Sequence, residues 1–416
     1  MKKRLLATLT AAMMVVSLAA CGGSSSGGAS SAAAEASTAA VEASTAAAEA
    51  STAAAEASTA EETPTDTGGE NMRVAMITDY GDITDQSFNQ TTYEASKAFC
   101  ESNGIDFTYY KPAGDSTAER VAMIDKAVAD GYNVVVLPGF AFADAIYETA
   151  SLYPDLKYVA LDVSEGDLTA YGAREFDAAN VFSAVYQEEI SGYFAGYAAV
   201  KLGYKSLGFL GGMAVPAVQR FGYGFVQGAD DAAAELGLTD VEVNYVYGGL
   251  FYGTPEFTAA MDTWYGNGTE VVFACGGGIY TSAAEAAQKV DGKVIGVDVD
   301  QAAIIDGYYG AGMTVTSAMK GLAPTVETLL GAIYTGTWDA YAGQIQNLGL
   351  ISGTDPEFNY VQLPMETTQW GDGFTQEDYI ELVGKIYDGT IKVSNDISVE
   401  EPPASTITVN FQGNIQ

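Results

Sequence analysis

Four side chains that could bind a small polar molecule gather in one turn of this 416-residue sequence. The apolar run Val74 to Ile77 predicts a buried strand, and a helical pattern has begun by Ser87. The turn offers a carboxylate, a hydroxyl, an aromatic ring and a carboxamide, from Asp79, Ser87, Phe88 and Asn89. Ligands of open parallel α/β sheets bind at such strand-to-helix turns. We therefore predict that these four residues line a binding site.

Two further carboxylates follow predicted strands. Asp162 ends the run Tyr158 to Leu161 and should face the same crevice, unless it is only a turn residue. Asp298 could accept two hydrogen bonds from a vicinal diol, and Lys320 could neutralise it and donate to a ligand oxygen. A helix is predicted to start at Gln301, so we expect Asp300 to cap that helix and Asp298 to bind the ligand.

The glycine run Gly276-Gly277-Gly278 joins a predicted strand to a predicted helix. Backbone N–H groups without side chains, close to a helix N-terminus, could approach a ligand there. A tight turn without a ligand is the equal alternative. We take Gly277 as the candidate contact.

Strands alternate with amphipathic helices from Met72 onward, which is typical of a parallel α/β sheet covered on both faces. A long helix, predicted at 181–200, separates two similar series, so two Rossmann-like lobes are expected. Lobe 1 is expected at about 72–180 plus 300–335, and lobe 2 at about 181–299 plus part of 336–416. The predicted strands are 74–77, 106–110, 133–137, 158–161, 171–174, 206–210, 241–247, 271–274, 294–297 and 314–317.

Composition excludes several function classes. The chain has 18 Lys and Arg, 54 Asp and Glu and no His, so its net charge of −36 disfavours nucleic-acid binding. Without His there is no Ser-His-Asp triad and no His-based metal site. No GxGxxG or GxxxxGK[ST] motif occurs. We expect no catalysis, no cofactor and no metal, and two buried thiols at Cys100 and Cys275 rather than a disulfide.

The N-terminus is predicted to be a targeting segment. Residues 1–20 combine a basic start with an apolar stretch too short to span a membrane. The string Leu18 to Gly22 resembles the bacterial lipobox, so Cys21 is the expected lipidation site; cleavage of an ordinary signal peptide is the alternative. Residues 21–71, rich in Ala, Ser, Thr and Glu, are expected to be a flexible spacer between the membrane and a solute-binding domain at 72–416.

Four strings, in the same order, resemble signatures of the basic membrane protein family, also called the purine nucleoside receptor family. Its members are lipoprotein substrate-binding components of ABC importers. The first string is similar to the family's DxSFNQ signature. The loop near Gly248 and the tail after Tyr341 depart from the family pattern. The strings are Thr84–Gln90, Gln187–Ala199, Leu210–Pro216 and Val294–Gln301.

The resemblance implies a type I periplasmic-binding-protein architecture with hinge crossovers and a nucleoside between the lobes. Phe88 would stack on the base and Asn89 would read its edge, while Asp298 and Lys320 would contact ribose. A second ring is expected from Phe251, with Tyr252 as the alternative.

The family also implies partners and a location. We expect a monomer, lipid-anchored on the extracytoplasmic face of the cell membrane, that delivers a nucleoside, purine by preference, to an ABC permease. The alternative is the same fold binding a sugar or a signalling ligand for a membrane sensor.

Overall fold

The computed structural model describes residue 69 and residues 71–415 of the chain. The predicted signal peptide, Cys21 and the spacer up to residue 68 lie outside these residues. No helix in the described part is both long and apolar enough to cross a membrane.

The first lobe is built on a sheet with the strand order β11-β5-β4-β3-β1-β2, in which every neighbouring pair is parallel. Alternate residues of β1 face opposite layers: Val74 and Met76 pack with α2, whereas Ala75 and Ile77 pack with α3 and α4. Both faces are therefore covered, as parallel sheets require. The strands are β1 Arg73–Ile77, β2 Asp106–Tyr110, β3 Val134–Pro138, β4 Lys157–Leu161, β5 Val181–Tyr186 and β11 Ile345–Leu348; the helices are α2 Phe88–Asn103, α3 Thr117–Ala129, α4 Ala143–Thr149, α5 Glu165–Leu168 and α11 Leu322–Tyr334.

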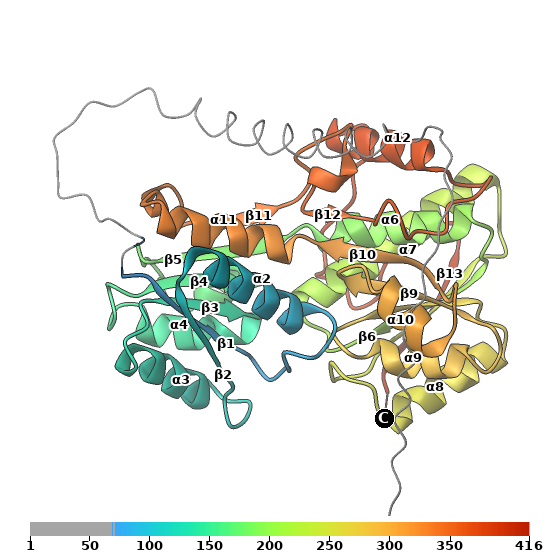
Figure 1. The fold of residues 1–416 in the computed structure, drawn as a ribbon. Coiled ribbons are helices and arrows are strands. Elements are labelled where there is room, and N and C mark those ends of the chain that lie inside the picture. The colour runs from blue at the N-terminus through green and yellow to red at the C-terminus, as the bar shows by residue number, and fades with distance from the viewer. Residues whose placement is uncertain (1–68, 70, 416) are drawn as a thin grey trace, which may run out of the picture. The chain divides into compact units, whose positions relative to one another are not determined.

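The second lobe has the strand order β12-β10-β9-β8-β6-β7-β13, with only the β10–β12 pair antiparallel. Figure 1 shows the two lobes side by side, with the blue to teal elements and the orange helix α11 in the first lobe and the yellow elements in the second. Helices α6 and α7 pack together along one face. The strands are β6 Ser206–Gly211, β7 Glu242–Tyr247, β8 Val271–Cys275, β9 Lys293–Asp298, β10 Thr314–Lys320, β12 Val361–Gln362 and β13 Thr408–Asn414; the helices are α6 Glu188–Lys201, α7 Pro216–Leu236, α8 Pro255–Gly266, α9 Tyr280–Ala287, α10 Ala302–Tyr309 and α12 Gln376–Tyr387.

The described chain passes between the lobes at three places: from β5 to α6, from β10 to α11, and from β11 to β12. These crossovers lie together, because the N–H of Gln187 donates to the carbonyl of Leu348 at 2.9 Å and the N–H of Gly321 donates to the carbonyl of Tyr360 at 2.7 Å. The Tyr186 hydroxyl also bonds Thr325 Oγ1 at 2.9 Å. Hydrogen-bonded crossovers of this kind form a hinge between two rigid lobes.

Two predicted elements are wrong. Residues 171–174 form a turn with Tyr171 exposed rather than a strand, and the predicted helix at 181–200 is a strand followed by a helix. The strand β5 and the helix α6 are both buried, including Glu188 and Glu189, so the stretch lacks an exposed polar face whose period would separate the two elements. The expected lobe boundaries change with them. Strand β5 belongs to the first sheet, and β10, expected in lobe 1, belongs to the second.

A C-terminal segment closes one edge of the second sheet, where β13 pairs in parallel with β7. Asp230 anchors this segment: its carboxylate accepts hydrogen bonds from the N–H groups of Ser405, Thr406 and Ile407, at 3.1, 2.7 and 3.0 Å. The sequence analysis did not predict this strand. An anchored end strand covers the polar groups of β7 that would otherwise be open to another chain.

We expect Asp230→Ala to lower the free energy of unfolding by about 1–2 kcal/mol, because charge-assisted hydrogen bonds to the backbone are lost. Urea denaturation measures this loss, and Asp230→Asn, which keeps an acceptor, should lose less. An unchanged midpoint for Asp230→Ala would mean that the strand is held by its apolar contacts alone.

Candidate functional site

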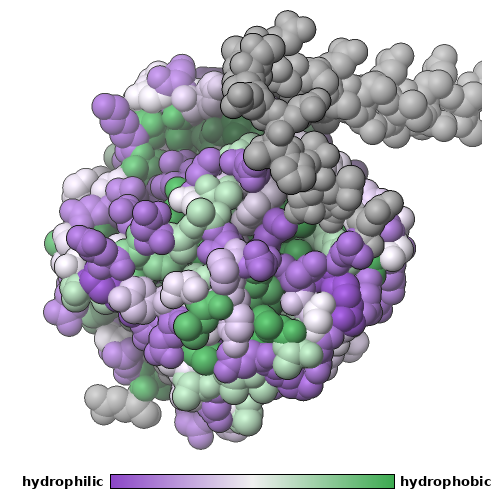
Figure 2. All heavy atoms as spheres, turned by 90° about the vertical axis from the view of Figure 1, so that its left-hand side faces the viewer, coloured by the Kyte–Doolittle hydropathy of each residue, from purple (hydrophilic) through white to green (hydrophobic). Residues whose placement is uncertain are grey.

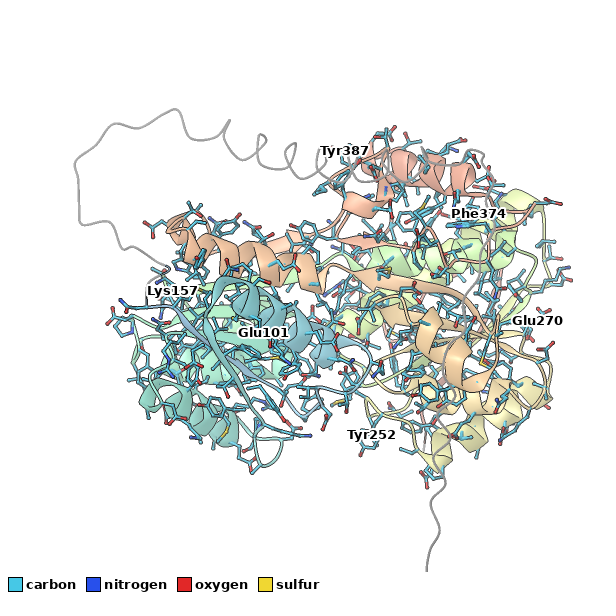
Figure 3. The ribbon with its side chains drawn as sticks, in the orientation of Figure 1. Glu101, Lys157, Tyr252, Glu270, Phe374 and Tyr387 are labelled. Carbon is cyan, nitrogen blue, oxygen red and sulfur yellow. The ribbon has the colours of Figure 1, made fainter. Side chains whose placement is uncertain are left out.

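A cavity of about 920 Å³ lies between the lobes, at the carboxyl ends of both sets of strands. It is lined by most of the predicted site residues: Asp79, Phe88, Asn89, Asp162, Phe251, Gly277, Asp298 and Lys320. Figure 3 shows Tyr252 at the lower edge of the second lobe.

Ser87 is placed differently from the other predicted residues. It is fully buried, and its hydroxyl donates to Asp298 Oδ2 at 2.6 Å. Because Ser87 comes from the first lobe and Asp298 from the second, this bond joins the lobes. Ser87 therefore orients Asp298, and its own hydroxyl is already engaged.

The two aspartates that follow strand ends adopt a backbone conformation that is rare for residues other than glycine. Asp162 has φ of +60° and Asp298 has φ of +67°. Such left-handed residues cost free energy and cluster at ligand sites, where the conformation aims the side chain. Here both side chains turn toward Lys320.

Lys320 is the centre of the charge arrangement, and its side chain is 3% exposed. Its Nζ lies 2.5 Å from Asp162 Oδ2, 3.6 Å from Glu188 Oε1 and 3.7 Å from Asp298 Oδ1. Burial alone would lower the pKa of Lys320, but the carboxylates of Asp162, Asp298 and Glu188 outweigh it and raise that pKa. Lys320 is therefore a fixed cation that neutralises acidic groups from both lobes.

Two of the carboxylates around Lys320 have an oxygen that could still accept a hydrogen bond. Burial raises the pKa of Asp162 to about 6, although Lys320 acts to lower it. Within the described residues, Asp162 Oδ1 and Glu188 Oε1 are buried without a hydrogen-bond partner. Arg220 donates to the other oxygen of Glu188 at 2.6 Å. A ligand that brings hydrogen-bond donors would satisfy Asp162 Oδ1, whose residue lines the cavity.

The turn before α2 is organised by Asp85. Its carboxylate accepts the N–H groups of Ser87, Asn89 and Gln90 at 2.9–3.0 Å and thereby caps the helix. It also accepts from the Asn89 amide at 3.2 Å. The Asn89 Nδ2 group is thus engaged, while Asn89 Oδ1 is buried without a partner in the described structure.

Aromatic rings from both lobes flank the cavity. Lys320 Nζ lies 4.6 Å from the centroid of the Phe88 ring. The Phe251 ring stacks on Tyr80 from the opposite lobe, with centroids 5.9 Å apart and planes inclined by 16°. Phe251 also packs tightly against Gly212, where an added Cβ would lie 2.6 Å from the ring. Tyr252, the alternative to Phe251, is 60% exposed.

Three cavity or network residues were missed by the sequence analysis: Tyr80, Glu188 and Arg220. Glu188 and Arg220 lie in or beside strings that resemble the family, but their charges were not paired because 32 residues separate them. Tyr80 stands beside Asp79 in the turn, and nothing in its spacing marks it. Gln301, and not Asp300 as predicted, is the N-cap of α10; Asp300 lies one residue before it and accepts a hydrogen bond from the N–H of Ala302 at 3.0 Å.

The cysteine prediction is confirmed for the described residues: Cys100 and Cys275 are free and buried in different lobes. Burial raises the pKa of the Cys275 thiol well above its usual value. Cys275 lines the cavity as a small apolar group, and its thiol is kept protonated.

Glu189 predicts a pH dependence of stability. Burial, followed by repulsion from Glu188, raises the pKa of Glu189 to about 7. A raised carboxyl pKa means that this group stabilises the fold most below its unfolded pKa, near pH 4.5, and that the contribution is lost as pH rises through about 7. Thermal unfolding between pH 5 and 8 should show this decline.

Glu189→Gln should reduce that decline and stabilise the protein at pH 8 by about 1 kcal/mol. The gain is small because the substitution also removes the attraction of Arg220, 3.9 Å away. Glu285→Gln on the exposed side of α9 is a matched control. An equal pH slope for wild type and Glu189→Gln would contradict the assignment.

Comparisons with known proteins agree with this geometry. Residues 72–358 match the family described as Bmp, ABC transporter substrate-binding protein PnrA-like. A nucleoside-binding ABC transporter protein, BmpA of Lactococcus lactis, is 29% identical over 56% of this chain and 65% of its own length, just under two thirds. Basic membrane protein B of Borreliella burgdorferi is 25% identical over 72% of this chain and 85% of its own.

A solved solute-binding protein of an ABC transporter system from Aeropyrum pernix has a TM-score of 0.63 at 22% identity, covering 79% of this chain and 95% of that one. This likeness supports the fold alone: two α/β lobes of the type I solute-binding class. Because the family match extends over most of the chain and includes the strand ends that carry the cavity, the chain belongs to the Bmp family of ABC transporter substrate-binding proteins.

Proposed function

We propose that this protein binds a nucleoside, purine by preference, between its lobes and delivers it to an ABC permease. One observation carries the proposal: Asp162 and Asp298 face each other across Lys320, which lies 4.6 Å from the ring of Phe88. Carboxylates suit the hydroxyl groups of a ribose, and an aromatic face suits a flat base.

The polar atoms of the site support a ligand rich in hydrogen-bond donors. Asp162 Oδ1 and Asn89 Oδ1 are both acceptors without partners in the described residues, and both residues line the cavity. Leaving such groups unpaired costs about 1–3 kcal/mol each, so a ligand that donates to them gains affinity.

Closure of the lobes would accompany binding. Phe88 and Asp162 come from the first lobe, Asp298 and Lys320 from the second, so a ligand touching these groups stabilises the closed form. We propose no bond-making or bond-breaking step, and therefore no cofactor or metal.

The proposal also covers how the protein is held at the cell membrane. Lipid on Cys21 would hold a monomeric protein on the extracytoplasmic face of the membrane, with residues 21–71 as the spacer. An acidic surface fits a protein that stays soluble beside a membrane. Figure 2 shows one face of the molecule as mostly hydrophilic, with separate small apolar patches.

The test is calorimetric titration of the purified full-length protein, in mild detergent, with adenosine, guanosine, inosine, cytidine, uridine and ribose. Binding of purine nucleosides at micromolar levels or tighter, with no heat from ribose, is the expected result. Heat only from sugars would reassign the cavity to a sugar, and no heat from any of these ligands would overturn the proposal.

A further inference from the structure

A buried glutamine outside the cavity joins the two lobes. Gln301 is the N-cap residue of α10 in the second lobe, and it is 1% exposed. Its Nε2 donates to the carbonyl oxygen of Gln86, in the turn before α2 of the first lobe, at 3.0 Å. Neither residue is among the described residues that line the cavity. This bond therefore connects the lobes without taking part in the contact with a ligand.

The second lobe fixes the orientation of the Gln301 amide. The N–H of Val297 donates to Gln301 Oε1 at 2.9 Å. Because a backbone N–H can only donate, the amide oxygen must face it, and the NH₂ group is left for Gln86. The N–H of Gln301 donates in turn to Ser317 Oγ at 3.1 Å. The amide is thus already oriented by its own lobe when it meets the first lobe.

The first lobe holds the carbonyl group that receives this bond in an unusual conformation. Gln86 has φ of +57°, in the left-handed region that is rare for residues other than glycine. Its N–H donates to Gln90 Oε1 at 3.1 Å. Such conformations cost free energy and persist where the surrounding structure determines them. A bond from the other lobe to the Gln86 carbonyl is one such determinant.

A second bond between the lobes lies next to the first. Ser87 follows Gln86 and donates to Asp298 Oδ2 at 2.6 Å, and Phe88, the next residue, lines the cavity. The turn that carries the proposed stacking ring is therefore attached to the end of β9 and to the start of α10. Both bonds join different lobes, so they exist only while the lobes are together.

We infer that Gln301 is a positioning residue for solute binding: its bond to Gln86 stabilises the closed form and slows the release of a bound ligand. The inference rests on the proposed function, which supplies the nucleosides used as probes. A ligand enters the open form, in which the bond is absent, so loss of the bond should leave the association rate unchanged. Loss of one hydrogen bond should speed release by about 2- to 13-fold.

Two substitutions of Gln301 test this role. Gln301→Met keeps the length of the side chain and removes the donor to Gln86. Gln301→Asn keeps the amide but is one methylene shorter, which withdraws the amide from Gln86, and it is the smaller disturbance if the methionine variant does not fold. Both variants should release nucleoside faster than wild type.

Gln369→Met is the matched control. Gln369 Nε2 donates to the carbonyl oxygens of Gly312 and Thr314, both at 2.8 Å, and all three residues belong to the second lobe. The control therefore loses hydrogen bonds from a glutamine amide to the backbone, as Gln301→Met does, but none that crosses between the lobes. Its midpoint in urea should fall, while its release rate should equal that of wild type.

The measurement uses full-length protein in mild detergent, loaded with tritiated guanosine or tritiated adenosine. Release is followed by filtration after dilution into an excess of the unlabelled nucleoside, and the association rate is taken from the rate of binding at several nucleoside concentrations. Faster release in both Gln301 variants, with unchanged association rates and an unaffected Gln369→Met, supports the inference.

Three results would count against it. Release at the wild-type rate in a folded Gln301 variant, or equal acceleration in Gln369→Met, would overturn the inference and leave the nucleoside function standing. A slower association rate with unchanged release would also overturn it, because the bond would then act before closure. Wild-type protein that retains neither nucleoside would overturn the proposed function and the inference with it.

Discussion

Lys320→Met is expected to destabilise the protein by about 3–5 kcal/mol, the largest effect of any single substitution considered. The buried ammonium balances three carboxylates, Asp162, Glu188 and Asp298, at 2.5–3.7 Å. Removing one partner of a buried ionic group leaves the others without compensation, which typically costs this much. Methionine has a similar length, so the loss would reflect charge rather than a cavity.

Urea denaturation at pH 7.5 measures the change, with Lys289→Met as the matched control. Lys289 pairs with Asp262 at 2.7 Å, but about half of its side chain is exposed, so less than about 1 kcal/mol should be lost. The deficit of Lys320→Met should shrink on acidification, because Asp162, whose pKa is already about 6, then becomes neutral. Equal losses of stability for the two variants would show that Lys320 does not stabilise the three carboxylates around it.

The parts of the fold that the sequence predicted are those where local pattern and burial agree. Strands β1, β4 and β9 lie within one residue of the predicted positions, since short buried apolar runs mark them. The stretch 181–200 failed because α6 is buried on nearly every side, so it has no polar face. The strand β13 was not predicted because its pairing with β7, 166 residues earlier, leaves no signal in the local sequence.

The site shows the same division. Residues at strand ends were predictable, because parallel strands deliver their carboxyl ends to one edge. Their partners were not: Lys320 meets Asp162 across 158 residues, and Ser87 meets Asp298 across 211. Asp298 could be assigned to the cavity, but only the structure shows that Ser87 supports it instead of facing a ligand.

The second large effect concerns Phe88. Phe88→Ala should weaken binding of purine nucleosides by roughly 5- to 150-fold, because the stacking of a base on an aromatic ring is worth about 1–3 kcal/mol. Lys320 also lies over this ring, so a part of the loss reflects a less fixed ammonium. Calorimetric titration of guanosine into wild type and into Phe88→Ala measures the loss.

Phe99→Ala, on the same helix but in contact with Tyr334 and away from the cavity, is the matched control for α2. It should leave nucleoside affinity within about twofold while lowering stability, because an aromatic contact in the fold is lost. Phe88→Ala should lose nucleoside affinity while losing less stability. If both variants lost affinity equally, the effect would come from a disturbed helix, and the base would have to stack on Phe251 alone.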